Sequence, residues 1–560
     1  MGGIAGPAAR RGRSGYQTPW KPVPMPFKTS QFEAEQVYKS PPMETDCGID
    51  KAQYSASSVP AGAEKYFKKL EPCSKLRSRA VRGGAVTVIT NALTFGIQMA
   101  GTIILARLLT PRDFGLVAMV TTFSLFLQTF VTGFTEATIQ RETISHSQIS
   151  NLFWINIGVS SLMTLLFWFA SPCIAWLYKE PELKVISLGV AFSIVASSLG
   201  TQHRALLQRN MQFGLVSCNS VVAKGISLIV AVAAARMGLG YWALIAGLLL
   251  LPFIEGVGAW VCCRWRPGLP SRGTGVRPMI TFGLNTFGYW GANYVTRNLD
   301  NLLVAWCYGS LSLGSYKKAY DLFALPANQL SVPLTDVAVA SLSRLRDDPE
   351  KYRRNYVKAL SLLAFMGVGL SAILTLAGKD LVRLVLGAQW DEAGRIFTYF
   401  APGIGIMILY NTNGWLHLST GRADRWFRWG MIEMVVTCVL FAVGLSFGPR
   451  GVAVAWAASF CLLLGPGLSY AGLPIGLSFS SVLSAVWKYA VSAFVAGLLC
   501  WTLLDWVEPS ASYFRELSSA IRVMAFGCSF TLMYVTLLLL FPFSSTFGPI
   551  IDILKTLRRQ

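Results

Sequence analysis

One apolar segment of the chain carries a stripe of polar side chains. They recur every four residues, with a carboxylate three residues after the arginine: Asn285, Tyr289, Asn293, Arg297, Asn301 and Asp300. Residues at this spacing lie on one side of an α-helix. A charge at mid-membrane costs roughly 2.5–3.5 kcal/mol, so Arg297 needs water or a partner, and Asp300 is the nearest candidate. The stripe therefore predicts either the wall of a hydrated cavity or an ion pair between helices.

Charged residues occur in other apolar segments as well. Lys317 and Asp321 are four residues apart and can face each other, while Lys318 points elsewhere. The sequence leaves two interpretations of this pair open: a place in a transport pathway, or a position at the membrane interface. Glu136 lies near the end of a second apolar segment, and the sequence names no partner for it. We interpret the run HRALLQRNMQF (203–213) as a short basic loop.

The elements that must position these residues are membrane-spanning helices. Of the 560 residues, 53% are hydrophobic and 14% charged, whereas soluble domains carry about 25% charged residues. Apolar runs of about 20 residues, the length that spans hydrocarbon as a helix, recur along the chain. We expect an all-α integral membrane protein with about 14 spans, near 84–108, 114–137, 151–178, 183–206, 213–236, 239–263, 279–308, 313–341, 355–377, 393–419, 427–447, 450–470, 482–505 and 520–542.

The charge distribution orients these spans. The net charge is +21, from 49 Lys and Arg against 28 Asp and Glu. The basic residues lie between apolar runs, where the positive-inside rule explains them without a nucleic-acid partner. Alternate loops carry most of them, which predicts a multi-pass protein with both termini cytoplasmic. An even number of spans follows, and 12 would fit as well as 14.

An internal repeat divides the membrane region. Residues 106–115 (ARLLTPRDFG) and 305–314 (AWCYGSLSLG) each join two spans, at an offset of about 199 residues. That offset carries Thr94, Gln98 and Thr102 onto Asn293, Arg297 and Asn301, so two polar stripes coincide. We predict two six-helix lobes related by a pseudo-twofold axis along the membrane normal.

These patterns predict five parts along the chain. Residues 1–80 form a disordered, basic cytoplasmic tail, because they are rich in Gly, Pro and basic residues and show no periodicity. Residues 81–270 and 271–470 form the N-terminal and C-terminal lobes. Residues 471–545 add two transmembrane helices, and 546–560 form a second basic cytoplasmic tail.

Enzyme signatures are missing from the sequence. No H-E-x-x-H, G-x-S-x-G or G-x-x-x-x-G-K-[ST] motif occurs. The 11 cysteines lie mostly as single small hydrophobes in apolar runs, and three histidines give little basis for a metal site. We expect no enzyme and no cofactor, with energy supplied by an H⁺ or Na⁺ gradient, by the gradient of the substrate or by another subunit.

Several segments together resemble a known family. They are residues 82–119, 137–159 (ATIQRETISHSQISNLFWINIGV), 205–213 (ALLQRNMQF), 293–304 (NYVTRNLDNLLV), 313–326 (LGSYKKAYDLFALP) and 341–349 (SLSRLRDDP). The chain is similar over about residues 80–470 to the polysaccharide transport family, which includes Wzx-like flippases. That family belongs to the multidrug/oligosaccharidyl-lipid/polysaccharide exporter superfamily.

The resemblance implies alternating-access movement of an isoprenoid-diphosphate-linked oligosaccharide across the bacterial inner membrane. Arg297 is then the candidate for binding the diphosphate or for ion coupling, because a guanidinium suits phosphate. Asp300 holds Arg297 or takes part in cation coupling, and Gln98, Asn293 and Asn301 bond sugar hydroxyls. Membrane lipids, a glycan polymerase and a chain-length regulator are the implied partners. The alternatives are a drug/cation antiporter of the same superfamily and a membrane glycan polymerase or ligase.

Overall fold

The computed structural model describes residues 66–67, 76–141, 143–506 and 517–540, and the secondary structure of these residues is helical. The α-helices are α1 (Leu76–Leu108), α2 (Pro111–Gln140), α3 (His146–Tyr178), α4 (Glu182–Leu199), α5 (Thr201–Arg209), α6 (Phe213–Arg236), α7 (Tyr241–Cys263), α8 (Arg277–Ser343), α9 (Pro349–Leu386), α10 (Asp391–Phe400), α11 (Pro402–Asn411), α12 (Asn413–Ser419), α13 (Ala423–Leu445), α14 (Gly448–Gly472), α15 (Phe479–Trp501) and α17 (Ser519–Leu539). Short 3₁₀ or π turns follow α9, α14 and α15: η4 (Ala388–Trp390), η5 (Leu473–Ile475) and η6 (Thr502–Trp506).

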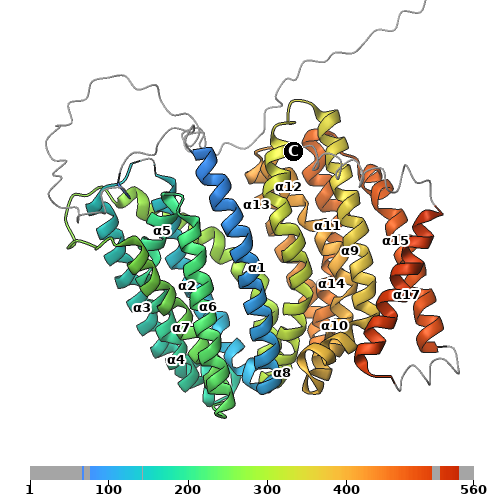
Figure 1. The fold of residues 1–560 in the computed structure, drawn as a ribbon, viewed down its shortest axis with the longest axis horizontal. Helices are drawn as coiled ribbons and strands as arrows, with labels where there is room; N and C mark the ends of the chain where they lie inside the picture. The colour runs from blue at the N-terminus through green and yellow to red at the C-terminus, as the bar shows by residue number, and fades with distance from the viewer. Residues whose placement is uncertain (1–65, 68–75, 142, 507–516, 541–560) are drawn as a thin grey trace, which may run out of the picture. The chain divides into compact units, whose positions relative to one another are not determined.

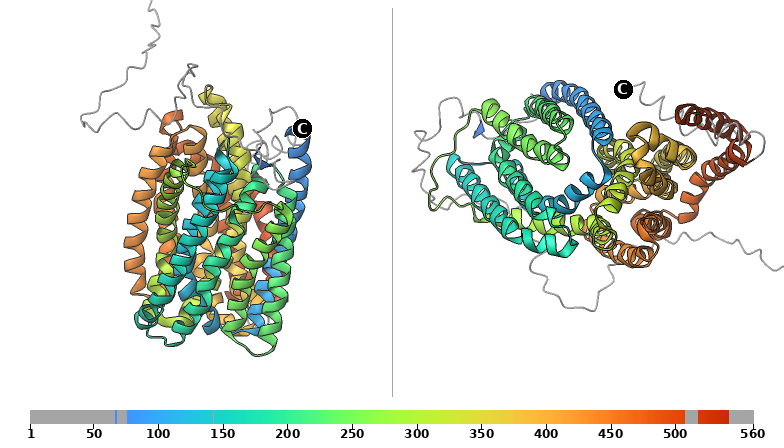
Figure 2. Two further views of the ribbon diagram at one scale, coloured as in Figure 1. Left: turned by 90° about the vertical axis from the view of Figure 1, so that its left-hand side faces the viewer. Right: turned by 90° about the horizontal axis from the view of Figure 1, so that it is seen from below.

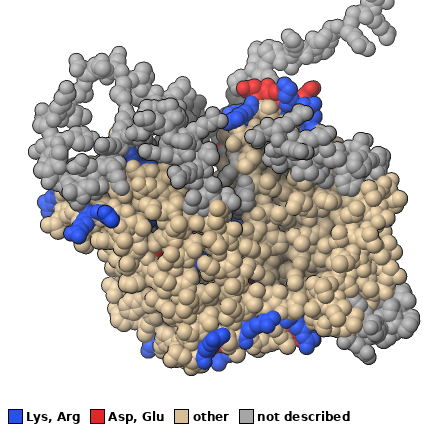
Figure 3. Space-filling model, viewed as in Figure 1, with Lys and Arg blue, Asp and Glu red and all other residues tan. Residues whose placement is uncertain are grey.

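The protein is a multi-pass membrane protein. Ten helices within the described ranges are long and apolar enough to cross a membrane, and the bent unit α10–α12 would be an eleventh. The helices α2 and α8 are outside that count, so the predicted number of fourteen is not confirmed. Figure 3 shows Lys and Arg gathered toward two rims of the visible face, with a band of other residues between them. This pattern is typical of a surface that contacts lipid.

The helices pack in two groups that meet along α2 and α8. In the first helix group (α1–α7), α6 packs on α1 and α7, and α4 packs on α2, α3 and α7. In the second helix group (α8–α14), α11 packs on both α9 and α14, and α15 and α17 lie against α9 (Figures 1 and 2). The most extensive contact between the groups is between α2 and α8. The predicted lobe boundaries at 81–270 and 271–470 remain a prediction.

Helix α8 is a hairpin of two arms rather than one rod. Gly309 has φ 75° and ψ −175°, a conformation outside the helical region that L side chains disfavour. Asp300 and Tyr316, which would be about 24 Å apart on a straight helix, share a hydrogen bond of 2.8 Å. The arms correspond to the predicted spans 279–308 and 313–341.

The two groups touch through a reciprocal pair of glycines. A Cβ atom on Gly115 would lie 1.7 Å from the Ser310 carbonyl oxygen, and one on Gly314 would lie 1.8 Å from the Pro111 carbonyl oxygen. The repeat offset of 199 residues makes Pro111 equivalent to Ser310 and Gly115 equivalent to Gly314. The contact of Gly115 with Ser310 is therefore the repeat equivalent of the contact of Gly314 with Pro111. A twofold axis produces such reciprocal contacts, because it exchanges the two equivalent positions on either side of the interface. The predicted internal repeat therefore has a physical counterpart where the start of α2 meets the turn of the α8 hairpin.

Further bonds tie the groups together at the same end. The Gln389 side chain donates to the carbonyls of Ala106 and Leu109, at 2.5 and 3.0 Å, and the Trp390 indole donates to Ala106, at 2.7 Å. The Ala106 carbonyl belongs to the last turn of α1 and the Leu109 carbonyl directly follows it, and carbonyls at a helix end lack partners within the helix. The second helix group thus caps the end of α1.

Two details differ from the sequence predictions. Tyr66, inside the predicted disordered tail of 1–80, is buried in a cluster with Phe153 and Trp265, and α1 begins at Leu76. Apolar contact and helix formation extend the ordered part beyond the point where the hydrophobic run begins. Apart from Tyr66 and Phe67, the tail before residue 76 lies outside the described residues, as does 546–560. The predicted basic loop after residue 203 is helix α5, in which His203 is fully buried and stacks on Trp260.

Candidate functional site

Asp300 lies in the core of the α8 hairpin. Its side chain is fully buried, and one carboxylate oxygen accepts hydrogen bonds from the Tyr316 hydroxyl (2.8 Å) and the Trp456 indole (2.9 Å). The expected pairing of Asp300 with Arg297 is therefore wrong for this structure. The carboxylate faces the second arm of α8 and α14, where neutral donors meet it.

Arg297 is exposed, and no hydrogen bond or ion pair within 4 Å involves it among the residues that the structure describes. Its charge does interact electrostatically with Glu433 on α13. Glu433 itself accepts a hydrogen bond of 2.9 Å from Tyr410, which accepts one from Trp429. Among the described residues, Arg297 therefore interacts with Glu433 through charge alone, without a direct hydrogen bond.

Lys317 and Asp321 form the predicted pair, with Nζ and Oδ1 2.9 Å apart. The expectation that Lys318 points elsewhere is wrong, because its ammonium lies 3.8 Å from the other oxygen of Asp321 and over the Phe114 ring. Residues three and four positions apart on a helix both reach the same carboxylate. Asp321 therefore clamps two lysines at the contact between α8 and α2.

The remaining members of the predicted stripes are spread over two helices. Asn301 is buried and donates to the Asn298 side chain at 3.3 Å. Asn293 lies on α8, and its side chain is outside the described part of the structure. On α1, Thr94 and Thr102 are half-buried and Gln98 is exposed. A joint action of these residues with Arg297 across the axis remains a prediction.

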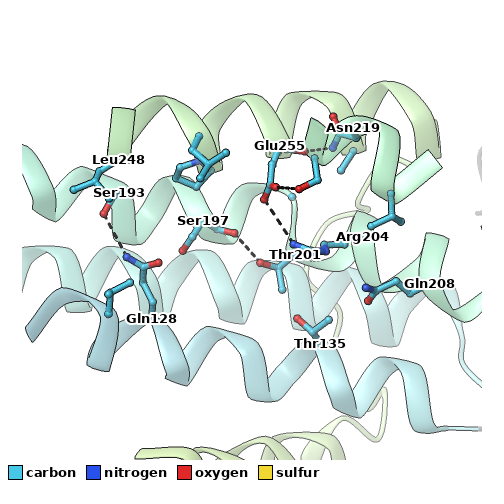
Figure 4. A pocket seen from close by; sticks show the side chains of 18 of the residues that line it. Gln128, Thr135, Ser193, Ser197, Thr201, Arg204, Gln208, Asn219, Leu248 and Glu255 are labelled. Carbon is cyan, nitrogen blue, oxygen red and sulfur yellow. Dashed lines mark hydrogen bonds and ion pairs between the residues drawn. The ribbon is translucent and has the colours of Figure 1, made fainter. Parts of the chain in front are cut away.

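A cavity lined by apolar side chains and several polar ones lies inside the first helix group. Its volume is about 580 Å³, and its walls come from α2, α4, α5, α6 and α7 (Figure 4). Glu136, the predicted α2 residue, lines it, and Thr135 lies beside Glu136. Leu125, Leu248 and Leu251 contribute apolar wall. The cavity therefore combines hydrogen-bonding groups with hydrocarbon surface, as small-molecule sites do.

Two polar stripes at helical spacing build this cavity. One runs through α4 and α5, and the other lies on α2: Ser193, Ser197, Thr201, Arg204 and Gln208, and Thr121, Ser124, Gln128 and Thr135. Steps of three, four and seven residues keep each set on one helix face. The sequence contains this signal, but hydroxyl stripes stand out less than a stripe with an arginine at its centre. The assignment of residues 203–213 to a loop also interrupted the stripe that runs through α4 and α5.

Glu255 on α7 organises one wall of the cavity. Its carboxylate accepts a 2.7 Å hydrogen bond from Ser220 and lies 3.6 Å from the Arg204 guanidinium. The Asn219 amide donates to the Glu255 backbone carbonyl at 2.9 Å. The Gln128 amide reaches the Ser193 hydroxyl at 3.4 Å on the opposite side (Figure 4). The charges of Arg204 and Glu255 are thus mutually balanced.

Curated relatives share the sequence over most of their own length. The chain is 26% identical over 408 residues to the teichuronic acid biosynthesis protein TuaB of Bacillus subtilis, covering 71% of this chain and 78% of TuaB. It is 26% identical over 378 residues to the succinoglycan biosynthesis transport protein ExoT of Rhizobium meliloti, covering 66% and 75%.

Solved structures show the same fold at low identity. The lipid II flippase MurJ, in an inward closed conformation, matches with a TM-score of 0.64 at 14% identity, over 84% of this chain and 100% of MurJ. An inward-facing multidrug resistance transporter of the MATE family matches with a TM-score of 0.54 at 10% identity, over 71% and 98%. The two proteins transport different cargo, so the fold alone does not select a substrate.

Residues 104–395, more than half of the chain, match the sequence profile of a family described as polysaccharide biosynthesis protein. That range contains both arms of α8, the glycine crossing and the whole cavity of the first helix group. The chain therefore belongs to the polysaccharide biosynthesis protein family.

Proposed function

We propose that this protein moves a saccharide attached to an isoprenoid diphosphate lipid across a bacterial inner membrane by alternating access. Membership of the polysaccharide biosynthesis family supports a saccharide cargo, and relatives named for teichuronic acid and succinoglycan point the same way. The shared fold with a lipid II flippase supports a lipid-linked form. Transport rather than catalysis fits a chain that places a few charged residues, among them Arg297 and Glu136, within its membrane-spanning helices.

The state of Arg297 carries this proposal. Arg297 is about 18 Å along the helix from Gly309, within a membrane-spanning arm. A cation at that depth without an ion pair is costly, and a lipid diphosphate passing through hydrated space between the helix groups would compensate it. A planar guanidinium can bind two phosphate oxygens at once. The long apolar tail of such a lipid can remain in the bilayer.

The energy source and surroundings belong to the same proposal. Coupling to H⁺ or Na⁺ would supply the work, and no cofactor is needed. Both termini would be cytoplasmic, in keeping with the loop charges. A glycan polymerase and a chain-length regulator would consume the delivered saccharide on the outer face.

The test is transport by purified protein in liposomes, with undecaprenyl diphosphate carrying one N-acetylglucosamine as the probe. Arg297→Ala should slow transfer by about 10- to 100-fold, since a hydrogen bond to a charged group contributes about 1.5–3 kcal/mol. Arg297→Lys keeps the charge and should retain part of the rate. Arg428→Ala, an exposed arginine paired with Asp424 on α13, is the control and should transport normally.

The outcomes separate the proposals for function. Unchanged transport by Arg297→Ala would remove this residue from the mechanism. If wild-type protein moved none of the lipid but exported a cationic dye such as ethidium, the antiporter alternative would replace the flippase.

A further inference from the structure

We propose that the cavity of the first helix group binds the saccharide part of the cargo and excludes its phosphates. This inference rests on the proposed transport of a lipid-linked saccharide and adds where the sugar binds and which kind of sugar is preferred. The cavity favours a neutral or amine-bearing sugar over an acidic one.

The position of the cavity separates it from the arginine of the α8 hairpin. Every residue that lines it belongs to α2, α4, α5, α6 or α7, or is Gly200 between α4 and α5. None comes from α8, which carries Arg297, Lys317 and Lys318. A head group made of a diphosphate and a sugar has two chemically different ends, and the molecule offers two different polar regions for them.

The cavity has hydrogen-bonding capacity that its own residues do not use. Thr135, Glu136 and Gln208 line it, and their side chains make no hydrogen bond or ion pair with other described residues. Unpaired polar groups among membrane-spanning helices are costly, so water or a ligand must satisfy them. Sugar hydroxyls both donate and accept, and the leucines of the wall suit the C–H faces of a sugar ring.

The charges of the cavity argue against phosphate. Arg204 and Glu255 are 3.6 Å apart and balance each other, which leaves Glu136 as the remaining formal charge on the lining. A carboxylate repels a diphosphate or a uronic acid placed nearby, and it attracts a protonated amine. The same carboxylate can accept hydrogen bonds from neutral hydroxyls.

The experiment compares two lipids on the same protein in nanodiscs: bare undecaprenyl diphosphate, and the same lipid carrying one N-acetylglucosamine. Wild type should bind the sugar-bearing lipid more tightly. Thr135→Val and Gln208→Leu should each lower that preference by about 2- to 10-fold, the equivalent of one neutral hydrogen bond. Thr122→Val is the matched control on α2, because Thr122 does not line the cavity and its hydroxyl bonds to the Ala118 carbonyl at 2.8 Å.

Binding of the bare lipid shows in each case that the variant is folded. If both cavity variants kept the wild-type preference for the sugar, the cavity would not be the sugar site, although transport by the wild type would stand. If one cavity variant bound neither lipid, it would count as misfolded, and the sugar preference of the other cavity variant would decide the test. Glu136→Gln should raise the affinity for a glucuronic-acid-bearing lipid relative to the neutral one, and an unchanged ratio would overturn the proposed preference against acidic sugars.

Discussion

Polar side chains differ in their surroundings between the α8 hairpin and the cavity of the first helix group. In the hairpin, Asp300 is held by two neutral donors and Asp321 holds two lysines, so most charges there have partners inside the protein. In the cavity, Thr135, Glu136 and Gln208 have none among the described residues. The difference indicates that most polar groups of the hairpin stabilise the contact between helices, whereas those of the cavity are available to a ligand.

The largest expected effect comes from removing Asp300. Asp300→Ala leaves the Tyr316 hydroxyl and the Trp456 indole buried without an acceptor, at about 1–3 kcal/mol for each donor. We expect a clear drop in the thermal unfolding temperature in detergent. Glu136→Gln, in the cavity, should leave that temperature nearly unchanged. If Asp300→Ala and Glu136→Gln lowered the unfolding temperature equally, the proposed difference between the two regions would be wrong.

Asp321 should have the next largest effect. Asp321→Ala leaves the buried Lys318 ammonium without its carboxylate, and breaking a buried pair from one side costs about 3–5 kcal/mol when burial is complete. Asp321 is partly exposed, so a smaller loss is expected. A double-mutant cycle between Asp321→Ala and Lys318→Met should show coupling above about 0.5 kcal/mol. Additive losses would mean that the pair contributes no stability.

The smallest expected effect is on the Arg204–Glu255 pair of the cavity. Both side chains are partly exposed, and such pairs contribute about 0–1 kcal/mol. Glu255→Gln should therefore change stability little. It should instead strengthen binding of the diphosphate lipid, because Arg204 loses its counter-charge. An unchanged affinity for that lipid would place the Arg204 charge outside the reach of the ligand.

Much of the fold was predictable because hydrocarbon imposes a length and a composition on each helix. The internal repeat was predictable because Gly115 and Gly314 lie at equivalent positions, and the structure brings them together. The partner of Asp300 was not predictable, since Trp456 is 156 residues away and any neighbouring donor could have served. The sequence favoured Asp300 as the partner of Arg297 because residue spacing reveals neighbours on the same helix but not on other helices.

The cavity was missed for a related physical reason. Ser and Thr tolerate apolar helices by bonding to carbonyls three or four residues earlier, as Ser197 does to Ile194 and Thr201 to Ser197. Their hydroxyls therefore give no clear sign, in one sequence, of whether they face lipid, a neighbour or a cavity. Only the convergence of α2, α4, α5, α6 and α7 distinguishes these possibilities.

The glycine crossing also determines how the two halves can move. With backbone resting directly on backbone, Gly115 and Gly314 form a fulcrum, and the side-chain bonds of Gln389 and Trp390 to α1 hold the two helix groups together at that end. Across a hydrocarbon thickness of about 30 Å, a tilt of about 10° at this point separates the opposite ends by about 5 Å. A small rocking at one membrane face is thereby converted into a large opening at the other.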